Sequence, residues 1–289
     1  KKDAGDLISY SIKNDERERI SRITIIGILE ALWSPKKDRA AVFYLDQDIK
    51  KGFLHIGTSS VAVLPSGITS ASWSPNGSMF AYTSLSLNGS ALSVKNASGE
   101  NTRIIFESPL KDAHIQWVSP DVIQIQTAPS GVAESSIFRY SQTSGVLSKI
   151  ISGYGLVSLW SPNGERAVFS STNSFGKNMS LSLHDADGNA IFATGLRTIA
   201  EKCFWASSKT LYCAVPREIP TSAIMPDDYY LAALHTSDRV VRIDIEKEEI
   251  RDVFNEGDFN ITNLIITKNE DMIFFVDRRD GTLWKYSIK

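Results

Sequence analysis

The sequence has few of the residues that mark metal centres, membrane spans or nucleic-acid surfaces. Its 289 residues include two cysteines and four histidines, and none stands in the Cys-x-x-Cys or His-x-x-x-His spacing of a metal site. No apolar run approaches the roughly 20 residues that a membrane-spanning helix needs. The formal net charge is −2, from 31 basic and 33 acidic residues, which leaves no electrostatic footprint for nucleic acid. We therefore expect no metal, no cofactor and no nucleic-acid partner.

Catalytic motifs are missing as well. No Gly-x-Ser-x-Gly nucleophile turn occurs, and no length remains beside the repeats described below for an α/β-hydrolase domain. Asp185-Ala186-Asp187-Gly188 resembles the start of a calcium loop but lacks the later glutamate, so we expect a turn there. Four histidines stand singly and are expected to be satisfied strand or loop residues: His55, His114, His184 and His235. These absences favour a protein that is not an enzyme.

What the sequence does contain is a repeated turn motif. Trp160-Ser161-Pro162-Asn163-Gly164 precedes the apolar run 167–169, and Trp73-Ser74-Pro75-Asn76-Gly77 precedes the apolar run 80–82. The steps between successive repeat Trp residues are 40, 44, 43 and 45 residues. The other copies begin at Trp33, Trp117 and Trp205, and at Ile266 where the Trp is lost. A period of roughly 40–45 residues with several strands in each unit is typical of a β-propeller.

The motif has a physical explanation. Proline fixes φ at the second position of a tight turn, asparagine tolerates the third, and glycine supplies the positive φ that closes it. An apolar strand on each side makes a hairpin. The Trp ends the first strand, where its ring can pack between neighbouring sheets. We expect the five repeat Trp residues to belong to the core and not to a sugar- or base-stacking platform: Trp33, Trp73, Trp117, Trp160 and Trp205.

The repeats predict an all-β, six-bladed propeller of four-stranded antiparallel blades that forms a single domain over residues 1–289. The sixth unit stops after its third strand, at 283–288, and its outer strand is expected from residues 20–26, which would close the ring. Residues 7–12 match a third strand, so further residues upstream would make seven blades the alternative. The charged stretch 13–19 has mixed signs and is expected to be a solvated loop.

The two cysteines flank the turn of the fifth hairpin. If Trp205 lies opposite Leu211, then Cys203 lies opposite Cys213. Directly opposed strand residues have Cβ atoms about 4.5–5.5 Å apart, which is longer than most disulfides prefer. We therefore expect two buried free thiols, with a strained bridge as the alternative.

One long insertion departs from the period, at residues 216–238 between the second and third strands of the fifth unit. Three prolines stiffen it, and Tyr229 and Tyr230 stand side by side within it. Loops of this length without regular structure are usually functional or disordered, and this composition argues against disorder. We expect its removal to abolish partner binding and to leave the scaffold intact.

The Trp-Ser-Pro-Asn-Gly hairpins resemble the WD-like repeats of TolB-like bacterial propellers, from about Leu29 to Ile288. The closest copy is 161–166, and units five and six depart from the pattern at the turn. The stretches 203–205, 214–216 and 227–230 look like those of uncharacterised envelope-associated propellers. The resemblance implies a binding platform in the periplasm or at the cell surface, often tethered to the membrane through an N-terminal anchor, which here would lie upstream of Lys1.

The leading functional hypothesis is a monomeric, non-enzymatic module that binds a protein or peptide on the face carrying the insertion. Aromatic residues and arginine are the usual anchors of such interfaces. The candidate binding residues are Arg217, Asp227, Asp228, Tyr229, Tyr230, Arg278 and Arg279. Two alternatives stay open for the face itself: the two tyrosines bind a partner, or they cover the apolar end of a blade.

Two other classes of function are kept as alternatives. An enzyme acting on a glycan or peptide would place acidic or histidine groups at the mouth of the central channel, where only Glu30, His114, Glu201 and Lys202 are expected. An intracellular WD-repeat-type scaffold would be favoured by two free thiols and by a gene without a leader.

Overall fold

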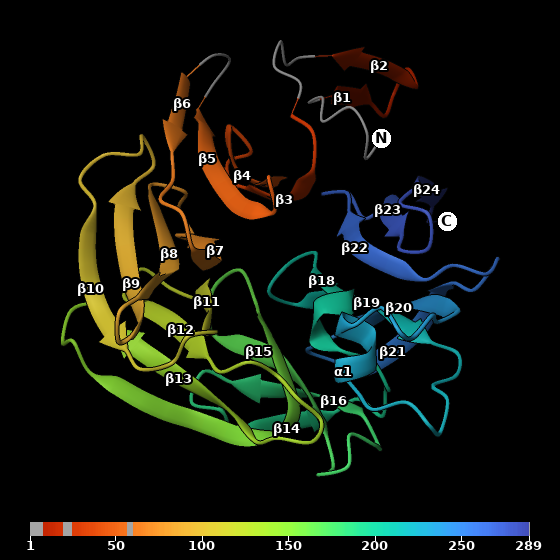
Figure 1. Ribbon diagram of the computed structural model, residues 1–289. Helices are drawn as coiled ribbons and strands as arrows, with labels where there is room; N and C mark the ends of the chain where they lie inside the picture. Colours follow the sequence, from red (N-terminus) through yellow and green to blue (C-terminus); the bar gives the residue numbers. More distant parts are fainter. Residues whose placement is uncertain (1–7, 20–24, 57–59, 289) are drawn as a thin grey trace. The chain divides into compact units, whose positions relative to one another are not determined.

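The computed structural model describes residues 8–19, 25–56 and 60–288, and Figure 1 labels its elements. Within these residues the chain forms 24 strands, one short α-helix and one short 3-10 helix, so the expected all-β class is confirmed. The chain divides into two compact units. The first comprises residues up to 125 together with 141–146, and the second comprises 126–140 and the residues from 147 onward.

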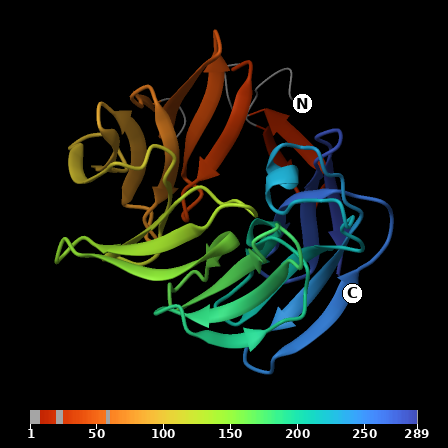
Figure 2. The same ribbon diagram turned by 60° about the horizontal axis from the view of Figure 1, so that its bottom comes forward.

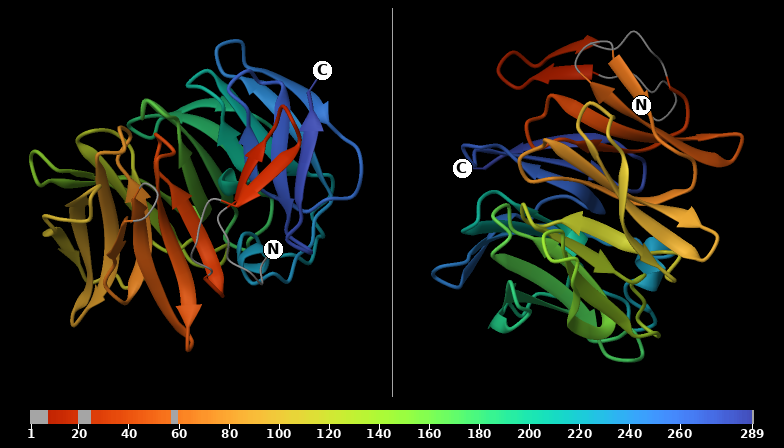
Figure 3. Two further views of the ribbon diagram at one scale, coloured as in Figure 1. Left: turned by 90° about the horizontal axis from the view of Figure 1, so that it is seen from above. Right: turned by 90° about the vertical axis from the view of Figure 1, so that its left-hand side faces the viewer.

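The first unit contains two antiparallel four-stranded sheets, each with its strands in chain order. One sheet holds β3 (Ile28–Trp33), β4 (Arg39–Asp46), β5 (Ile49–Ile56) and β6 (Ser60–Val63). The other holds β7 (Ile68–Trp73), β8 (Met79–Ser86), β9 (Gly89–Asn96) and β10 (Arg103–Ser108), seen from other sides in Figures 2 and 3. The strands β11 (His114–Trp117) and β12 (Val122–Gln126) follow. The first two repeats thus give the predicted four-stranded antiparallel sheets.

The second unit continues the pattern. Its consecutive neighbours are β13 (Ser135–Ser141), β14 (Leu147–Trp160), β15 (Arg166–Thr172), β16 (Ser180–Asp185) and β17 (Ala190–Ala193). A four-stranded sheet follows: β18 (Cys203–Trp205), β19 (Thr210–Pro216), β20 (Asp238–Asp244) and β21 (Glu249–Phe254). The last sheet holds β22 (Ile261–Ile266), β23 (Met272–Asp277) and β24 (Leu283–Ser287). The short helical elements are η1 (Ala200–Lys202) and α1 (Asp227–Tyr230).

The strand β14 runs from one repeat into the next. Its first half pairs with β13 and its second half, from Tyr154 on, pairs with β15. The two halves are joined through Gly155, whose φ of +60° a glycine adopts readily. One 14-residue strand therefore serves as the outer strand of one repeat and the inner strand of the next.

The ends of the chain confirm one expectation and correct another. The last sheet has three strands among the described residues, as the sequence predicted for the sixth unit. The strand expected at 20–26 falls largely outside the described residues. The charged stretch expected as a loop instead contains β2 (Glu16–Arg19), which pairs antiparallel with β1 (Ile8–Ser11). Its four side chains are all exposed, and a solvated strand tolerates charge as readily as a loop does.

The repeated turn has the predicted geometry. The backbone N–H of Gly77 donates to the carbonyl of Ser74 at 2.8 Å, and Gly77 has φ of +69°. The serine of the motif, which the sequence reading left unexplained, closes the hairpin from inside. The Ser74 Oγ accepts the N–H of Met79 at 2.9 Å, and Ser161 accepts that of Arg166 at 3.1 Å. The motif therefore fixes the first pair of strands in these two repeats.

Four of the five repeat Trp side chains lie in the core as expected, and Trp33 does not. Trp73 is 7% exposed, and its Nε1 donates to the Leu32 carbonyl of the preceding repeat at 2.9 Å. Trp33 is 47% exposed. The physical reason is positional: Trp73 and Trp205 each donate to a carbonyl of the repeat before them, and Trp33 belongs to the first copy in the sequence.

Serine side chains join neighbouring inner strands that share no ladder. The hydroxyls of Ser70 and Ser72 on β7 accept the N–H groups of Ile115 and Trp117 on β11, at 3.0 and 2.9 Å. Each donor lies 45 residues after its acceptor, which is one repeat. Because these backbone N–H groups are paired with serine hydroxyls, the strand edge needs no further strand beside it.

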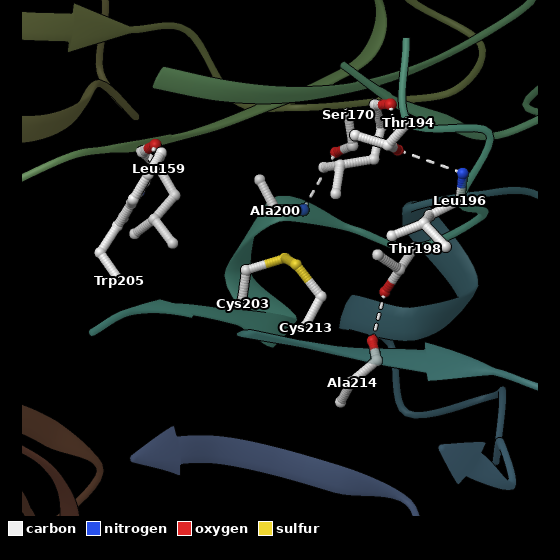
Figure 4. Close-up of a disulfide and its surroundings, with 11 residues drawn as sticks. Leu159, Ser170, Thr194, Leu196, Thr198, Ala200, Cys203, Trp205, Cys213 and Ala214 are labelled. Carbon is white, nitrogen blue, oxygen red and sulfur yellow. Dashed lines mark hydrogen bonds between the residues drawn. A yellow bond between two sulfur atoms is a disulfide. The ribbon is translucent and has the colours of Figure 1, made fainter. Parts of the chain in front are cut away.

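The cysteine expectation is corrected. Cys203 lies opposite Cys213, as predicted, but the two form a disulfide (Figure 4). Their Cα atoms approach to 3.9 Å, closer than the about 4.5 Å usual for a non-hydrogen-bonded pair, so the average strand separation used for the expectation of free thiols does not apply here. Hydrogen bonds hold the chain on either side: Thr198 Oγ1 donates to the Ala214 carbonyl at 2.7 Å, and Trp205 Nε1 donates to the Leu159 carbonyl at 3.2 Å.

Trp73 and Trp33 occupy the same position of the motif but differ in burial, so they give a matched test of how the repeats pack. The variant Trp73→Ala should lower the free energy of unfolding by about 3–5 kcal/mol, because it leaves a cavity and an unpaired Leu32 carbonyl. The variant Trp33→Ala, in the same motif but half exposed, should cost clearly less. Urea unfolding followed by circular dichroism measures both. Equal losses would contradict the packing described here.

Candidate functional site

The insertion between β19 and β20 leaves and re-enters the second unit at one point, because Pro216 pairs with Asp238 across the two strands. It carries the helix α1, which Figure 2 shows as a short coil. Four of its side chains, Ala223, Met225, Tyr229 and Leu234, belong to the hydrophobic core of this unit. The expectation that the insertion can be removed without harm to the scaffold is therefore wrong.

The first of two attachments uses Asp227. Its carboxylate accepts the Ser130 hydroxyl at 2.8 Å and the Gly131 N–H at 2.6 Å, both in the connection from β12 to β13. A Cβ atom at Gly131 would lie 2.2 Å from the Met225 carbonyl, so only glycine allows this approach. The neighbouring Asp228 accepts the N–H of Ile224 at 2.8 Å and fixes the start of α1. Both carboxylates are thus occupied by the fold.

The second attachment uses the loop between β15 and β16. The Met225 N–H donates to the Gly176 carbonyl at 2.9 Å. The Lys177 ammonium donates to the carbonyls of Ser222 and Ala223, at 2.7 and 2.6 Å. The insertion is therefore tied to the loops of two earlier repeats.

Beneath the insertion lies a buried ion pair. The Lys202 ammonium lies 2.6 Å from Asp238 Oδ2 and 3.0 Å from the Thr236 hydroxyl, and both charged side chains are at most 1% exposed. The same oxygen accepts the Ile261 N–H at 2.6 Å, while Asp238 Oδ1 is buried without a partner among the described residues. Burial lowers the pKa of Lys202, and the Asp238 charge opposes that shift. The pair joins η1, the end of the insertion and β22.

The two tyrosines have different environments. Tyr229 is 6% exposed, and the Arg278 guanidinium lies 4.0 Å from its ring centre and donates to its carbonyl at 2.6 Å. Burial raises the pKa of Tyr229. Tyr230 is 37% exposed, yet its hydroxyl is desolvated and hydrogen-bonds to Glu201, and desolvation and this bond raise its pKa. Tyr229 therefore has the covering role that the sequence left open, and Tyr230 reaches the surface.

The remaining predicted residues bind the connection between β21 and β22. Arg217 donates to Asn255 at 3.1 Å and to the Gly257 carbonyl at 3.1 Å. Arg279 forms ion pairs with Asp258 at 2.9 Å and with Asp277 at 2.7 Å, and the bonds to Asp277 raise the pKa of the guanidinium. Arg217 and Arg279 thus both form hydrogen bonds to neighbouring segments of the fold.

Sequence reasoning missed the exposed apolar side chains around the insertion. Leu231 is 77% exposed and directly follows α1. Phe175 is 72% exposed beside Gly176, and Val132 is also exposed, beside Gly131. Both therefore neighbour a residue that binds the insertion. We call Val132, Phe175, Tyr230 and Leu231 the insertion surface.

Two kinds of feature are absent from the described residues. No helix there is both long and apolar enough to cross a membrane. No group of three or more His, Cys, Asp or Glu side chains there could hold a metal ion.

The buried pair gives a prediction for stability. Replacing the cation in Lys202→Met leaves the Asp238 carboxylate buried and uncompensated, so the free energy of unfolding should fall by about 3–5 kcal/mol. The matched control is Lys209→Met, which removes an exposed pair with Glu246 and should cost no more than about 1 kcal/mol. Urea unfolding compares the two. A Lys202 variant as mild as the control would show that water reaches the pair.

No protein-family model and no curated protein matches this sequence. Many solved structures match its fold. TolB from Acinetobacter baumannii has a TM-score of 0.60 and 14% identity over 88% of this chain. The β-propeller domain of the Trilobed protease from Pyrococcus furiosus has a TM-score of 0.66 and 13% identity over 98% of this chain, and 89% of that domain is covered. An oligogalacturonate lyase from Vibrio parahaemolyticus has a TM-score of 0.65 and 8% identity over 97% of this chain, and 82% of that chain is covered.

These likenesses show that the chain has the β-propeller fold, with antiparallel four-stranded blades, and that TolB proteins are among its structural neighbours. The chain spans 60% of the length of the TolB chain. At 8–14% identity the neighbours carry the fold alone, and they include both TolB and lyase propellers.

Proposed function

We propose that this chain is a non-enzymatic binding module that presents the insertion surface to a protein or peptide partner. The observation that carries the proposal is the combination of firm attachment and exposure. The insertion is tied to two loops and to the core, yet it displays Tyr230 and Leu231 to solvent. Large apolar side chains on a fixed frame are suited to anchor a partner.

The attachments matter for affinity because binding loses less conformational entropy when the surface is already ordered. The charged residues first considered as anchors are used within the fold, so the proposed contact shifts to apolar and aromatic side chains. Tyr230 combines a ring that can pack with a hydroxyl already satisfied by Glu201.

We propose the cell envelope as the location. The disulfide between Cys203 and Cys213 supports an oxidising compartment, where such bonds persist. The likeness in fold to TolB proteins is consistent with that location.

The test uses point variants, because the insertion contributes to the core and its removal would harm the fold. Leu231→Asp and Phe175→Asp place a charge where an apolar contact is proposed. Each should weaken capture of the partner from an envelope extract at least about 10-fold, which corresponds to 1.4 kcal/mol. Thermal unfolding should stay unchanged, since both side chains are exposed.

The matched control is Leu87→Asp, at a fully exposed leucine in the turn between β8 and β9. It should retain full capture. If Leu231→Asp and Phe175→Asp also retain it, the insertion surface is not the binding site.

A second candidate is an enzyme acting on a glycan. Desolvation raises the pKa of Glu30 and lowers that of His114, and the Lys50 charge acts on both groups, although both side chains are exposed. The likeness in fold to oligogalacturonate lyases is the observation that favours this candidate. Cleavage of oligogalacturonate by the wild type, lost in Glu30→Gln, would favour this candidate over the binding module.

A further inference from the structure

A small pocket lies in the second unit between the first half of the insertion and the loop that follows β15. Its volume is about 220 Å³, and it is lined by residues 176–179, by Arg197 and by five residues of the insertion: Ile219, Pro220, Thr221, Ala223 and Met225. Pockets for drug-sized ligands measure about 300–1,000 Å³. This one is therefore suited to a single side chain or chain end and is too small for an oligosaccharide.

The pocket has charge of one sign. Lys177 and Arg197 line it, and no aspartate or glutamate does. Neither cation forms an ion pair with a carboxylate in the described part of the chain. The Lys177 ammonium is held by the carbonyls of Ser222 and Ala223, which leaves one of its three N–H donors for a ligand. Arg197 is exposed and brings a planar set of donors that matches a carboxylate.

The rest of the lining is mostly apolar. Met179 and Met225 form part of the wall and are themselves almost fully buried, and Ile219 and Pro220 come from the insertion. An anion with an aliphatic stem fits such a wall better than inorganic phosphate does, because its methylene groups lose water on binding.

We propose that this pocket binds a peptide carboxylate, either the end of the chain or an acidic side chain. Arg197 would pair with the carboxylate, Lys177 would add one N–H from a fixed position, and the methionines would contact the stem. The inference rests on the proposed function in that it takes the partner to be a peptide. It adds that the partner places a negative charge beside the insertion surface.

The pocket can be tested with short peptides and without the partner. Acetyl-Ala-Ala-Leu with a free carboxylate, the same peptide as an amide, and acetyl-Ala-Glu-Ala-amide are titrated into the full chain. The chain has four methionines, so methyl NMR can report the site. The Met179 and Met225 signals should shift, while those of Met79 and Met272, which do not line the pocket, should stay.

The amide should bind at least about 10-fold more weakly than the free carboxylate, and comparison with the glutamate peptide tells the two carboxylate sources apart. Arg197→Gln should weaken the better binder at least about 10-fold. Arg103→Gln, at an exposed arginine on β10, is the matched control and should bind like the wild type. Arg197 is substituted and Lys177 is not, because Lys177 also holds the insertion and its replacement would loosen it.

Three results would overturn the proposal: no methionine shift with either carboxylate peptide, equal binding by Arg197→Gln, or stronger binding of inorganic phosphate than of the peptides. These outcomes are separate from those of the capture experiment. If the peptides fail while Leu231→Asp still abolishes capture, the pocket is wrong and the binding module stands. If Leu231→Asp and Phe175→Asp retain capture while the peptides bind, the insertion surface is wrong as the binding site and the carboxylate pocket stands.

Discussion

An ammonium and a carboxylate held out of water, those of Lys202 and Asp238, are the contact on which the candidate site depends. Asp238 begins β20, at the point where the insertion returns to the sheet, and it also binds the first N–H of β22. Lys202 ends η1, just before the disulfide-linked strand β18. One buried pair thus joins the base of the insertion to two neighbouring sheets. A pair of this kind adds little net stability, but it penalises any arrangement that separates the partners.

The fold and the site use different parts of the same repeats. The Trp hairpins and the serine links between inner strands build the regular sheets. The insertion then adds its own side chains to the core and forms hydrogen bonds with neighbouring loops, which engage the charged groups of Asp227 and Arg278. What it leaves to solvent is apolar and aromatic. Binding through these side chains and through the pocket beside Lys177 would be compatible with a scaffold that other propellers use for different chemistry.

The regular features were predictable from sequence because they are local. The Ser-Pro-Asn-Gly turn encodes its own geometry, and the opposition of Cys203 and Cys213 followed from counting residues across a hairpin. The features that depend on distance between strands or on partners far along the chain were not predictable. To predict the disulfide, one would have needed the distance between the Cα atoms of the two cysteines. To predict the burial of Tyr229, one would have needed its contact with Arg278, 49 residues away. The exposure of Trp33 reflects its place as the first copy, which a motif viewed singly cannot show.

The central claim is that the insertion is an ordered part of the fold and not a flexible loop. Native-state hydrogen exchange of two backbone amides tests it most directly: Met225, bonded to the Gly176 carbonyl, and Gly131, bonded to Asp227. Both amides should exchange much more slowly than those of an unstructured peptide, with protection approaching that of the β19 amides. Exchange of both at the rate of an unstructured peptide would contradict it.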